Sequence, residues 1–307
     1  MNILKWISHN VRSLFRVIDR WRFRKTFSYV QNVLNMCVDI TKLPPARGKL
    51  RLLQEADLLL LRLFDAFCRR NGFTYMLAYG TLLGARRHGG FVPWDDDVDT
   101  FVLEEEYQQI IDKLEEEIRG TDFCLYGVDK CRLDDTTLRI SHRLVPQINL
   151  DIFYLLGSII EYEDRKSAYP KFKKLHTKYL SGYRWHISQT ENRSKISDCR
   201  SGGDKKLKEL IKGCSSAEAR TLWPDIINNT CAYARNDMLP TSMVTFEGCE
   251  FCAPNNIEAY LKEEYGDWMS FPSRFDHHGS EFLDFKEEDM LKMISHLEHC
   301  VAEGRFL

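Results

Sequence analysis

The chain lacks the features that most quickly place a protein in a class: a long apolar run, a cysteine framework, an excess of one charge and internal repeats. Its first 25 residues hold no uninterrupted apolar stretch long enough for a signal core or a membrane span. The ten cysteines are scattered without disulfide-framework spacing, which favours a reducing compartment. The formal net charge of -2 gives no domain-wide basic excess, so nucleic acid is not an expected partner. We therefore expect a cytoplasmic protein, either free in solution or bound to a surface.

Residues 1–45 are predicted to form an amphipathic helical segment. Apolar side chains recur at helical spacing from residue 4 to 30, and residues 1–25 hold seven lysines and arginines against one aspartate. The apolar stripe includes Trp6 and Trp21, which suit a membrane interface. The pattern predicts that residues 4–25 bind peripherally to the inner, anionic face of a membrane. Packing of the stripe on the rest of the chain or on a partner subunit is the alternative.

The remaining residues, 46–307, are predicted to form one α/β (α+β) domain in which helices flank a small mixed sheet. Two prolines and a glycine in "KLPPARGKL" (43–51) mark the boundary. Strands are predicted at 73–80, 98–103, 122–128, 137–144 and 147–155, with a hairpin at 245–254. Helices are predicted at 52–67, 81–88, 104–118, 255–265 and 286–301. The polar stretch from 161 to about 235 is expected to be mostly helical, which makes the C-terminal half largely helical.

Four aspartates occupy five positions of "YGTLLGARRHGGFVPWDDDVDTFV" (79–102). Asp97 and Asp99 lead into a strand, where residues two apart point to the same face. Carboxylates held that close repel each other unless a cation lies between them, and oxygen ligands favour Mg²⁺, with Mn²⁺ as an alternative. Another aspartate, Asp151, interrupts the apolar strand "NLDIFYLL". If the two strands are neighbours, Asp151 completes a three-carboxylate metal site, with Asp95 as a further candidate ligand.

Two other interpretations of the aspartates are weaker. A solvated acidic turn does not account for aspartates that alternate into a strand, where they are depleted. An EF-hand loop that starts at Asp95 needs a sharp turn at its sixth position, which is the β-branched Thr100. A metal-dependent enzyme is therefore favoured.

Small and basic side chains precede the aspartates. Gly80 and Thr81 follow a strand and open a helical turn, where backbone N–H groups can approach a phosphate. Arg86, Arg87 and His88 would hold further phosphate oxygens. A glycine turn, an Asp-x-Asp on a strand and a later single aspartate, in this order, indicate metal-dependent phosphoryl or nucleotidyl transfer.

This stretch resembles the LicD family of phosphocholine transferases, whose relatives include fukutin and fukutin-related protein. The family motif is close to G-T-L-L-G-A-x-R-H-x-G-F-I-P-W-D-D-D-x-D, followed later by I-D-I-F. The matching positions are Gly80 to Ala85, Arg87, His88, Gly90, Phe91, Pro93 to Asp97, Asp99 and Leu150 to Phe153, with Val92 in place of isoleucine. The stretch "APNNIEAYLKEEYGDWMSFP" (253–272) also resembles the family's ending, so the likeness spans roughly 50 to 275.

The resemblance implies a nucleotidyltransferase-like catalytic domain over residues 46–307, with Asp97, Asp99 and Asp151 as the catalytic, metal-binding carboxylates. The donor-phosphate site is expected at Gly80, Thr81, Arg86, Arg87, His88 and Trp94. The segment at about 160–240 has no counterpart in the motif, so we expect it to form a variable, acceptor-side region.

The function that the resemblance implies is transfer of phosphocholine from CDP-choline to a hydroxyl of a cell-surface glycan or a lipid-linked glycan precursor, with release of CMP. Lipopolysaccharide, teichoic acid and capsule are the classes of acceptor. CDP-ribitol, CDP-glycerol or CDP-ethanolamine as the donor is the alternative within the same chemistry. A non-catalytic glycan- or membrane-binding module is the alternative of another class.

Two further groups of residues, one aromatic and one of cysteines and histidines, could bind a ligand or could serve the fold alone. A quaternary ammonium group binds against aromatic faces. The candidates are Tyr79, Phe91, Trp94, Trp185 and Trp268, each of which could equally pack in the core. Cys249 and Cys252, with His277 and His278 further on, suggest zinc, but cysteines three apart on a strand face opposite ways.

Overall fold

The structure is a computed structural model, and it describes residues 30–126, 137–189, 202–203, 205–225, 231–272 and 283–307, with the backbone alone from 180 to 189. The chain divides into two compact units, Pro44–Gly266 with His278–Leu307, and Met1–Leu43 with Asp267–His277. The predicted membrane-binding helix at 4–25 lies outside the described residues and stays a prediction. Within the described ranges, no helix is both long and apolar enough to cross a membrane.

In the smaller unit, residues 30–37 are helical and a 3₁₀ turn, η1 (Ile40–Lys42), follows. Gln31 Nε2 donates to the Phe271 carbonyl at 2.6 Å, and Phe271 N donates to Asn35 Oδ1 at 2.8 Å. Two side chains of one helix thus bind the backbone of a segment that comes much later in the chain.

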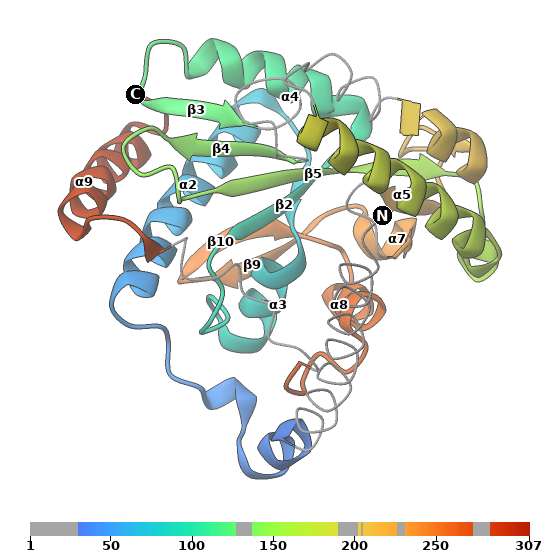
Figure 1. Cartoon of the computed structure of the whole chain (residues 1–307), viewed down its shortest axis with the longest axis horizontal. Coiled ribbons are helices and arrows are strands. Elements are labelled where there is room, and N and C mark those ends of the chain that lie inside the picture. Colours follow the sequence, from blue (N-terminus) through green and yellow to red (C-terminus); the bar gives the residue numbers. More distant parts are fainter. Residues whose placement is uncertain (1–29, 127–136, 190–201, 204, 226–230, 273–282) are drawn as a thin grey trace, which may run out of the picture. The chain divides into compact units, whose positions relative to one another are not determined.

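The larger unit is built on a mixed sheet with the main strand order β1-β2-β5-β4-β3 (Figure 1). These strands are β1 (Tyr75–Leu77), β2 (Val98–Leu103), β5 (Leu150–Ser158), β4 (Leu138–His142) and β3 (Phe123–Tyr126). β2 and β5 are parallel, whereas the other pairs in this order are antiparallel. Every residue of β2 and β5 is buried, as expected of parallel strands covered on both faces. The predicted α/β fold is confirmed.

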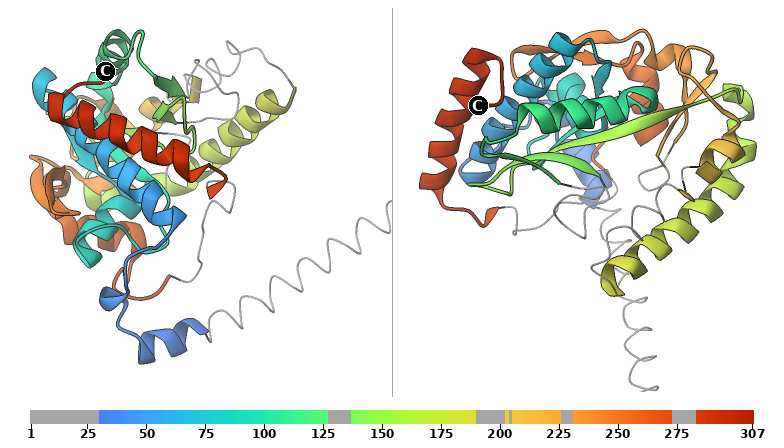
Figure 2. Two further views of the ribbon diagram at one scale, coloured as in Figure 1. Left: turned by 90° about the vertical axis from the view of Figure 1, so that its left-hand side faces the viewer. Right: turned by 90° about the horizontal axis from the view of Figure 1, so that it is seen from above.

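Helices cover both faces of this sheet. They are α2 (Lys49–Asn71), α3 (Tyr79–His88), α4 (Glu104–Glu117), α8 (Ile257–Tyr265) and α9 (Glu287–Glu303). Phe153 of β5 packs on the Tyr79 ring of α3, with ring centroids 5.2 Å apart. Its neighbour Tyr154 points to the opposite face and packs on Tyr107 of α4 at 4.6 Å. α9 lies along α2 (Figure 2).

The segment from 161 to 235 is only partly as predicted. It starts with a 3₁₀ turn, η2 (Tyr162–Asp164), and helix α5 (Arg165–Gln189), and residues 205–211 are also helical. The short strands β6 (Gly213–Cys214), β7 (Thr221–Pro224) and β8 (Tyr233–Ala234) follow. β6 and β7 pair with the second half of β5, and β8 pairs with β7. Leu222 and Trp223 are completely buried in this pairing. The prediction of a mostly helical segment is therefore wrong from 213 onward, because strands of two to four residues are too short to show a period in the sequence.

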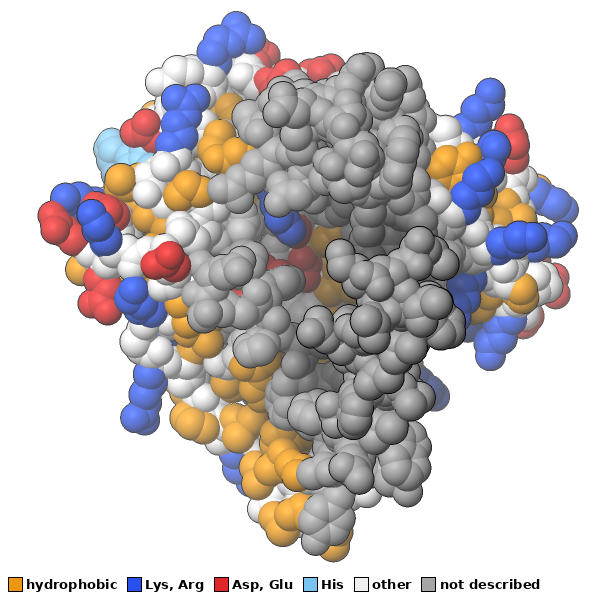
Figure 3. Space-filling model, in the orientation of Figure 1, with side chains coloured by type: hydrophobic (Ala, Val, Ile, Leu, Met, Phe, Trp, Pro, Cys, Tyr) orange, Lys and Arg blue, Asp and Glu red, His pale blue; other side chains and the backbone are white. Residues whose placement is uncertain are grey.

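The exposed side chains of α5 are largely basic. The helix contains no acidic residue, and its exposed lysines are Lys166, Lys171, Lys173, Lys174 and Lys178. Figure 3 shows basic side chains over α5, at the right of the view. The polar character predicted for this region is observed.

The predicted hairpin is formed by β9 (Ser242–Phe246) and β10 (Cys249–Ala253). Cys249 and Cys252 are three positions apart on β10, and both thiols are free. Because strand residues alternate between faces, β10 does not bring these two thiols together as metal ligands. His277 and His278 lie outside the described residues.

Candidate active site

The register of the two parallel strands brings two predicted metal ligands together. Asp99 of β2 lies directly opposite Asp151 of β5, and 8% and 4% of their surfaces are exposed. Burial raises the pKa of Asp99 well above its usual range, and the charges of Asp97, Asp151 and Asp95 raise this pKa further. The two strands are therefore neighbours, which is the condition set for a shared site, and Asp99 and Asp151 lie side by side near the start of both strands.

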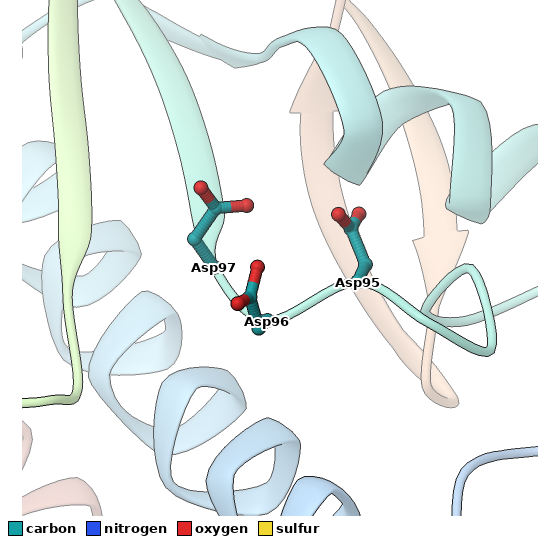
Figure 4. Close-up of side chains that lie close together, drawn as sticks. All are labelled: Asp95, Asp96 and Asp97. Atoms are coloured by element: carbon teal, nitrogen blue, oxygen red, sulfur yellow. The ribbon is translucent and has the colours of Figure 1, made fainter. Parts of the chain in front are cut away.

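The loop that enters β2 adds a compact group of carboxylates. Oxygens of Asp95, Asp96 and Asp97 lie within 4.8 Å of one another. Figure 4 shows the Asp97 side chain at the start of β2 and the Asp95 carboxylate pointing toward α3. Asp96 is buried, with 8% of its surface exposed. The sequence prediction gave Asp96 no role, although its carboxylate belongs to this group.

The first turn of α3 fixes the backbone of Asp99. Ala78 N donates to the Asp99 carbonyl at 3.0 Å, and Asp99 N donates to Thr81 Oγ1 at 2.9 Å. Thr81 was predicted to bind phosphate, and in the structure its buried hydroxyl oxygen accepts an aspartate N–H. Thr81 thus positions a candidate metal ligand.

Two glycines of α3 make room for the aspartate loop. A Cβ atom on Gly80 would lie 2.6 Å from Asp95 Oδ2. A Cβ atom on Gly84 would lie 2.5 Å from the Gly90 carbonyl oxygen and 2.9 Å from Val92 N. The space beside Gly80, predicted to admit a phosphate, is filled here by a carboxylate, and the space beside Gly84 is filled by backbone.

Gly84→Ala should destabilise the protein more than Gly80→Ala. The Gly84 variant must displace backbone of the aspartate loop, and overpacking of this kind costs about 1–3 kcal/mol. At Gly80 only the end of a side chain has to rotate, and the better helix propensity of alanine offsets part of that cost. Urea unfolding of both variants measures the difference. Equal free energies of unfolding would contradict the close backbone packing at Gly84.

The basic residues of α3 have three different environments. Arg86 is half exposed and pairs with Glu258 of α8, with Nη2 and Oε1 2.5 Å apart. Arg87 is buried, and its Nε donates to His88 Nε2 at 3.0 Å. Burial and the Arg87 charge lower the pKa of His88 to about 4, so its imidazole is neutral at pH 7. Burial lowers the pKa of Arg87 to about 10, so this arginine remains a cation, and the charge of Asp95 favours its protonated form.

Arg139 of β4 belongs to the site and was missed from the sequence. It lies directly opposite Asp151 in the register of β4 and β5. Its guanidinium donates two hydrogen bonds to that carboxylate, from Nε to Oδ1 at 2.6 Å and from Nη2 to Oδ2 at 3.0 Å. Such a fork fixes a carboxylate in one orientation. The predicted strand at 137–144 contained this arginine, but only the strand register places it against Asp151.

The aspartate loop is held from two further elements. Gln54 of α2 donates to the Asp95 carbonyl at 2.9 Å. Glu247, in the turn between β9 and β10, accepts from Phe91 N at 3.2 Å, while its own N donates to the Gly89 carbonyl at 2.9 Å. Arg51 of α2 binds both oxygens of Glu247, at 3.1 and 2.8 Å. The loop is therefore held by hydrogen bonds from α2 and from the turn between β9 and β10.

The aromatic candidates differ in their surroundings. Tyr79 packs on Phe153, as described, and Phe91 is buried against Phe246 with ring centroids 4.7 Å apart. Trp94 is half-buried beside Asp95 in the chain. Trp268 belongs to the smaller unit, and the side chain of Trp185 lies outside the described part. Core packing accounts for Phe91.

Comparison with known proteins agrees with this geometry over part of the chain. Residues 72–186 match the model of the LicD/FKTN/FKRP nucleotidyltransferase domain, which is less than half of the 307 residues. The lipopolysaccharide cholinephosphotransferase LicD of Haemophilus influenzae is 48% identical over 63 residues, which cover 20% of this chain and 24% of that protein. An uncharacterized protein of Rickettsia prowazekii is 42% identical over 50 residues, 15% of this chain and 19% of its own.

The chain thus matches a quarter or less of the length of these curated relatives. The matched domain contains the whole aspartate loop, β2, Arg139 and Asp151, whereas Gln54 and Glu247 lie outside it. Residues 72–186 are thus similar to the nucleotidyltransferase domain of the LicD/FKTN/FKRP family.

Proposed function

We propose that this chain transfers phosphocholine from CDP-choline to a hydroxyl of a cell-surface glycan or a lipid-linked glycan precursor, with release of CMP. The match of residues 72–186 to the LicD family supports a transferase. The name of the Haemophilus influenzae relative supports phosphocholine as the group and lipopolysaccharide as a class of acceptor. The observation that carries the proposal is the placement of Asp99 opposite Asp151 at the point where the Asp95–Asp97 loop arrives.

The donor set fits a divalent cation. Asp97, Asp99 and Asp151 offer only oxygen atoms, with Asp95 as a further ligand, and hard cations such as Mg²⁺ or Mn²⁺ prefer oxygen. Asp99 and Asp151 are buried at opposing positions, and although Arg139 pairs with Asp151, a cation would relieve the remaining repulsion. When bound, the cation would neutralise charge on the diphosphate of the donor.

The side chains around the aspartates suit the transfer itself. The acceptor hydroxyl oxygen would form a bond to the β-phosphorus, the bond from this phosphorus to the bridging oxygen would break, and CMP would leave as the hydroxyl loses its proton. Negative charge moves onto the bridging oxygen in this step, and fixed cations stabilise such charge. We assign this role to Arg87, which is buried, and to Arg139, which is half-buried and pairs with Asp151.

Thermal unfolding with a panel of donors tests the proposal. A ligand that binds only the folded state stabilises it by about 2.7 kcal/mol at a hundred times its Kd. With Mg²⁺ present, CDP-choline should raise the unfolding temperature more than CDP-ribitol, CDP-glycerol or CDP-ethanolamine does. A larger effect of another donor would reassign the alcohol. No effect of any CDP-alcohol would favour a non-catalytic binding module.

A further inference from the structure

A buried carboxylate lies beneath the aspartate loop, on a helix outside the matched domain. Asp57 of α2 has no exposed surface. Its Oδ1 accepts the N–H of Asn149 at 3.2 Å, just before β5 begins. Its Oδ2 is buried and has no hydrogen-bond partner in the described part of the chain. An unsatisfied buried carboxyl oxygen is costly, so packing alone does not explain an aspartate at this position.

α2 contacts both segments that carry the candidate metal ligands. Gln54, one helical turn before Asp57, binds the Asp95 carbonyl, and Asp57 itself binds the residue that leads into β5. Figure 4 shows α2 passing below Asp96. Burial raises the pKa of Asp57 well above its usual range, and the charges of Asp97, Asp96 and Asp151 raise it further. Asp57 therefore lies within the electrostatic field of the aspartate group.

We propose that Asp57 is a further carboxylate of the cation site and strengthens cation binding from the α2 side. The proposal rests on the proposed function, from which it takes the divalent cation. With a cation present, the unsatisfied oxygen gains a partner, either the ion or water bound to it, and the repulsion among the buried carboxylates is relieved. The site then needs α2 as well as the residues of the family domain.

The test compares three proteins: the full chain, Asp57→Asn and Glu106→Gln, each unfolded thermally over a range of Mn²⁺ concentrations. Asparagine keeps an oxygen that accepts the Asn149 N–H and replaces the unsatisfied oxygen with an uncharged NH2 group. Without Mn²⁺, Asp57→Asn should unfold at a higher temperature than the full chain. Loss of a supporting group costs about 10- to 100-fold in metal affinity, so its half-saturating Mn²⁺ concentration should rise at least about tenfold.

Glu106→Gln is the matched control. Glu106 is a part-buried carboxylate that accepts the Thr74 N–H at 2.7 Å, and burial likewise raises its pKa, with Glu105 rather than an aspartate of the site as the neighbouring charge. Its Mn²⁺ response should equal that of the full chain.

The outcomes separate this proposal from the proposed function. If Mn²⁺ does not stabilise the full chain, the cation-dependent function itself fails. If Mn²⁺ stabilises the full chain and Asp57→Asn at the same concentration, Asp57 takes no part and only this inference is overturned. Asp57→Ser replaces Asp57→Asn if the latter does not fold. Failure of both variants to fold, with and without Mn²⁺, would mean that the carboxylate serves the fold and would also overturn the proposal.

Discussion

Asp99→Asn and Asp151→Asn should each lower turnover by at least about 100-fold while the protein stays folded, a loss of the size seen when one fixed electrostatic group is removed from an active site. Both residues are buried at opposing positions of β2 and β5, so each substitution removes a charge from the centre of the site. CMP release from CDP-choline, measured with an acceptor extract, gives the turnover.

Asp99→Asn should be at least as stable as the original chain when no divalent cation is present, whereas Asp151→Asn also loses the ion pair with Arg139 and should be less stable. Removing one of several buried like charges relieves repulsion. Asp112→Asn, an exposed change on α4, is the control and should alter neither turnover nor stability. Full turnover in a folded Asp99→Asn protein would contradict the assignment of this site.

The raised pKa of Asp99 also predicts a pH dependence of the cation-free protein. Burial, followed by the charges of Asp97, Asp151 and Asp95, makes the folded state hold this proton more tightly than the unfolded chain does. The stabilisation is therefore complete below the ordinary carboxyl pKa and is lost as the pH rises through the raised value. Asp99→Asn should remove this part of the pH dependence, so its stability should fall less as the pH rises.

Arg139→Gln should cost about 1–3 kcal/mol of stability, because the Asp151 carboxylate then stays buried without its partner. Arg139→Lys should cost less, since it keeps the charge and loses only the fork. A divalent cation can replace the lost positive charge beside Asp151. We therefore expect Mn²⁺ to stabilise Arg139→Gln more than it stabilises the original chain in thermal unfolding.

Arg69→Gln provides the matched control for Arg139. Arg69 also contacts both oxygens of an aspartate, Asp65, but its side chain is half exposed, and such pairs contribute about 0–1 kcal/mol. Its loss should be small and Mn²⁺ should not compensate for it. If Mn²⁺ stabilised Arg139→Gln and Arg69→Gln equally, the cation would not be acting at Asp151.

The part of the site that lies in one continuous motif could be predicted from the sequence. The alternation of Asp97 and Asp99 into an apolar strand and the single aspartate in "NLDIFYLL" indicated a three-carboxylate site, on the condition that the two strands are neighbours. The observed register of Asp99 opposite Asp151 meets that condition. The role of these residues as metal ligands stays a prediction.

The supporting residues could not be predicted, because long-range packing alone assigns them. Gln54 and Asp57 read as two polar positions on an ordinary helix, and Glu247 as a turn residue. Their contacts with Asp95, Asn149 and Phe91 follow from how α2 and the hairpin dock on the loop. Local pattern carries no information about such pairs.

The same limit explains the error in the segment from 213 to 234. β7 is four residues long and reads as a strand only because it pairs with the second half of β5. The parallel strands β2 and β5 were easier, since both are long apolar runs bounded by turns. The short strands β6, β7 and β8 are therefore defined by their pairing in the sheet, whereas β2 and β5 could be predicted from the sequence pattern.

Calorimetric titration of CDP-choline into the original chain and into Asp99→Asn, each with Mg²⁺ and each with a chelator instead, tests the proposed chemistry most directly. Donor binding that depends on the cation held by the buried aspartates should be measurable only in the original chain with Mg²⁺. Binding of equal affinity in all four titrations, or no binding in any of them, would contradict a cation-dependent CDP-choline site at Asp99.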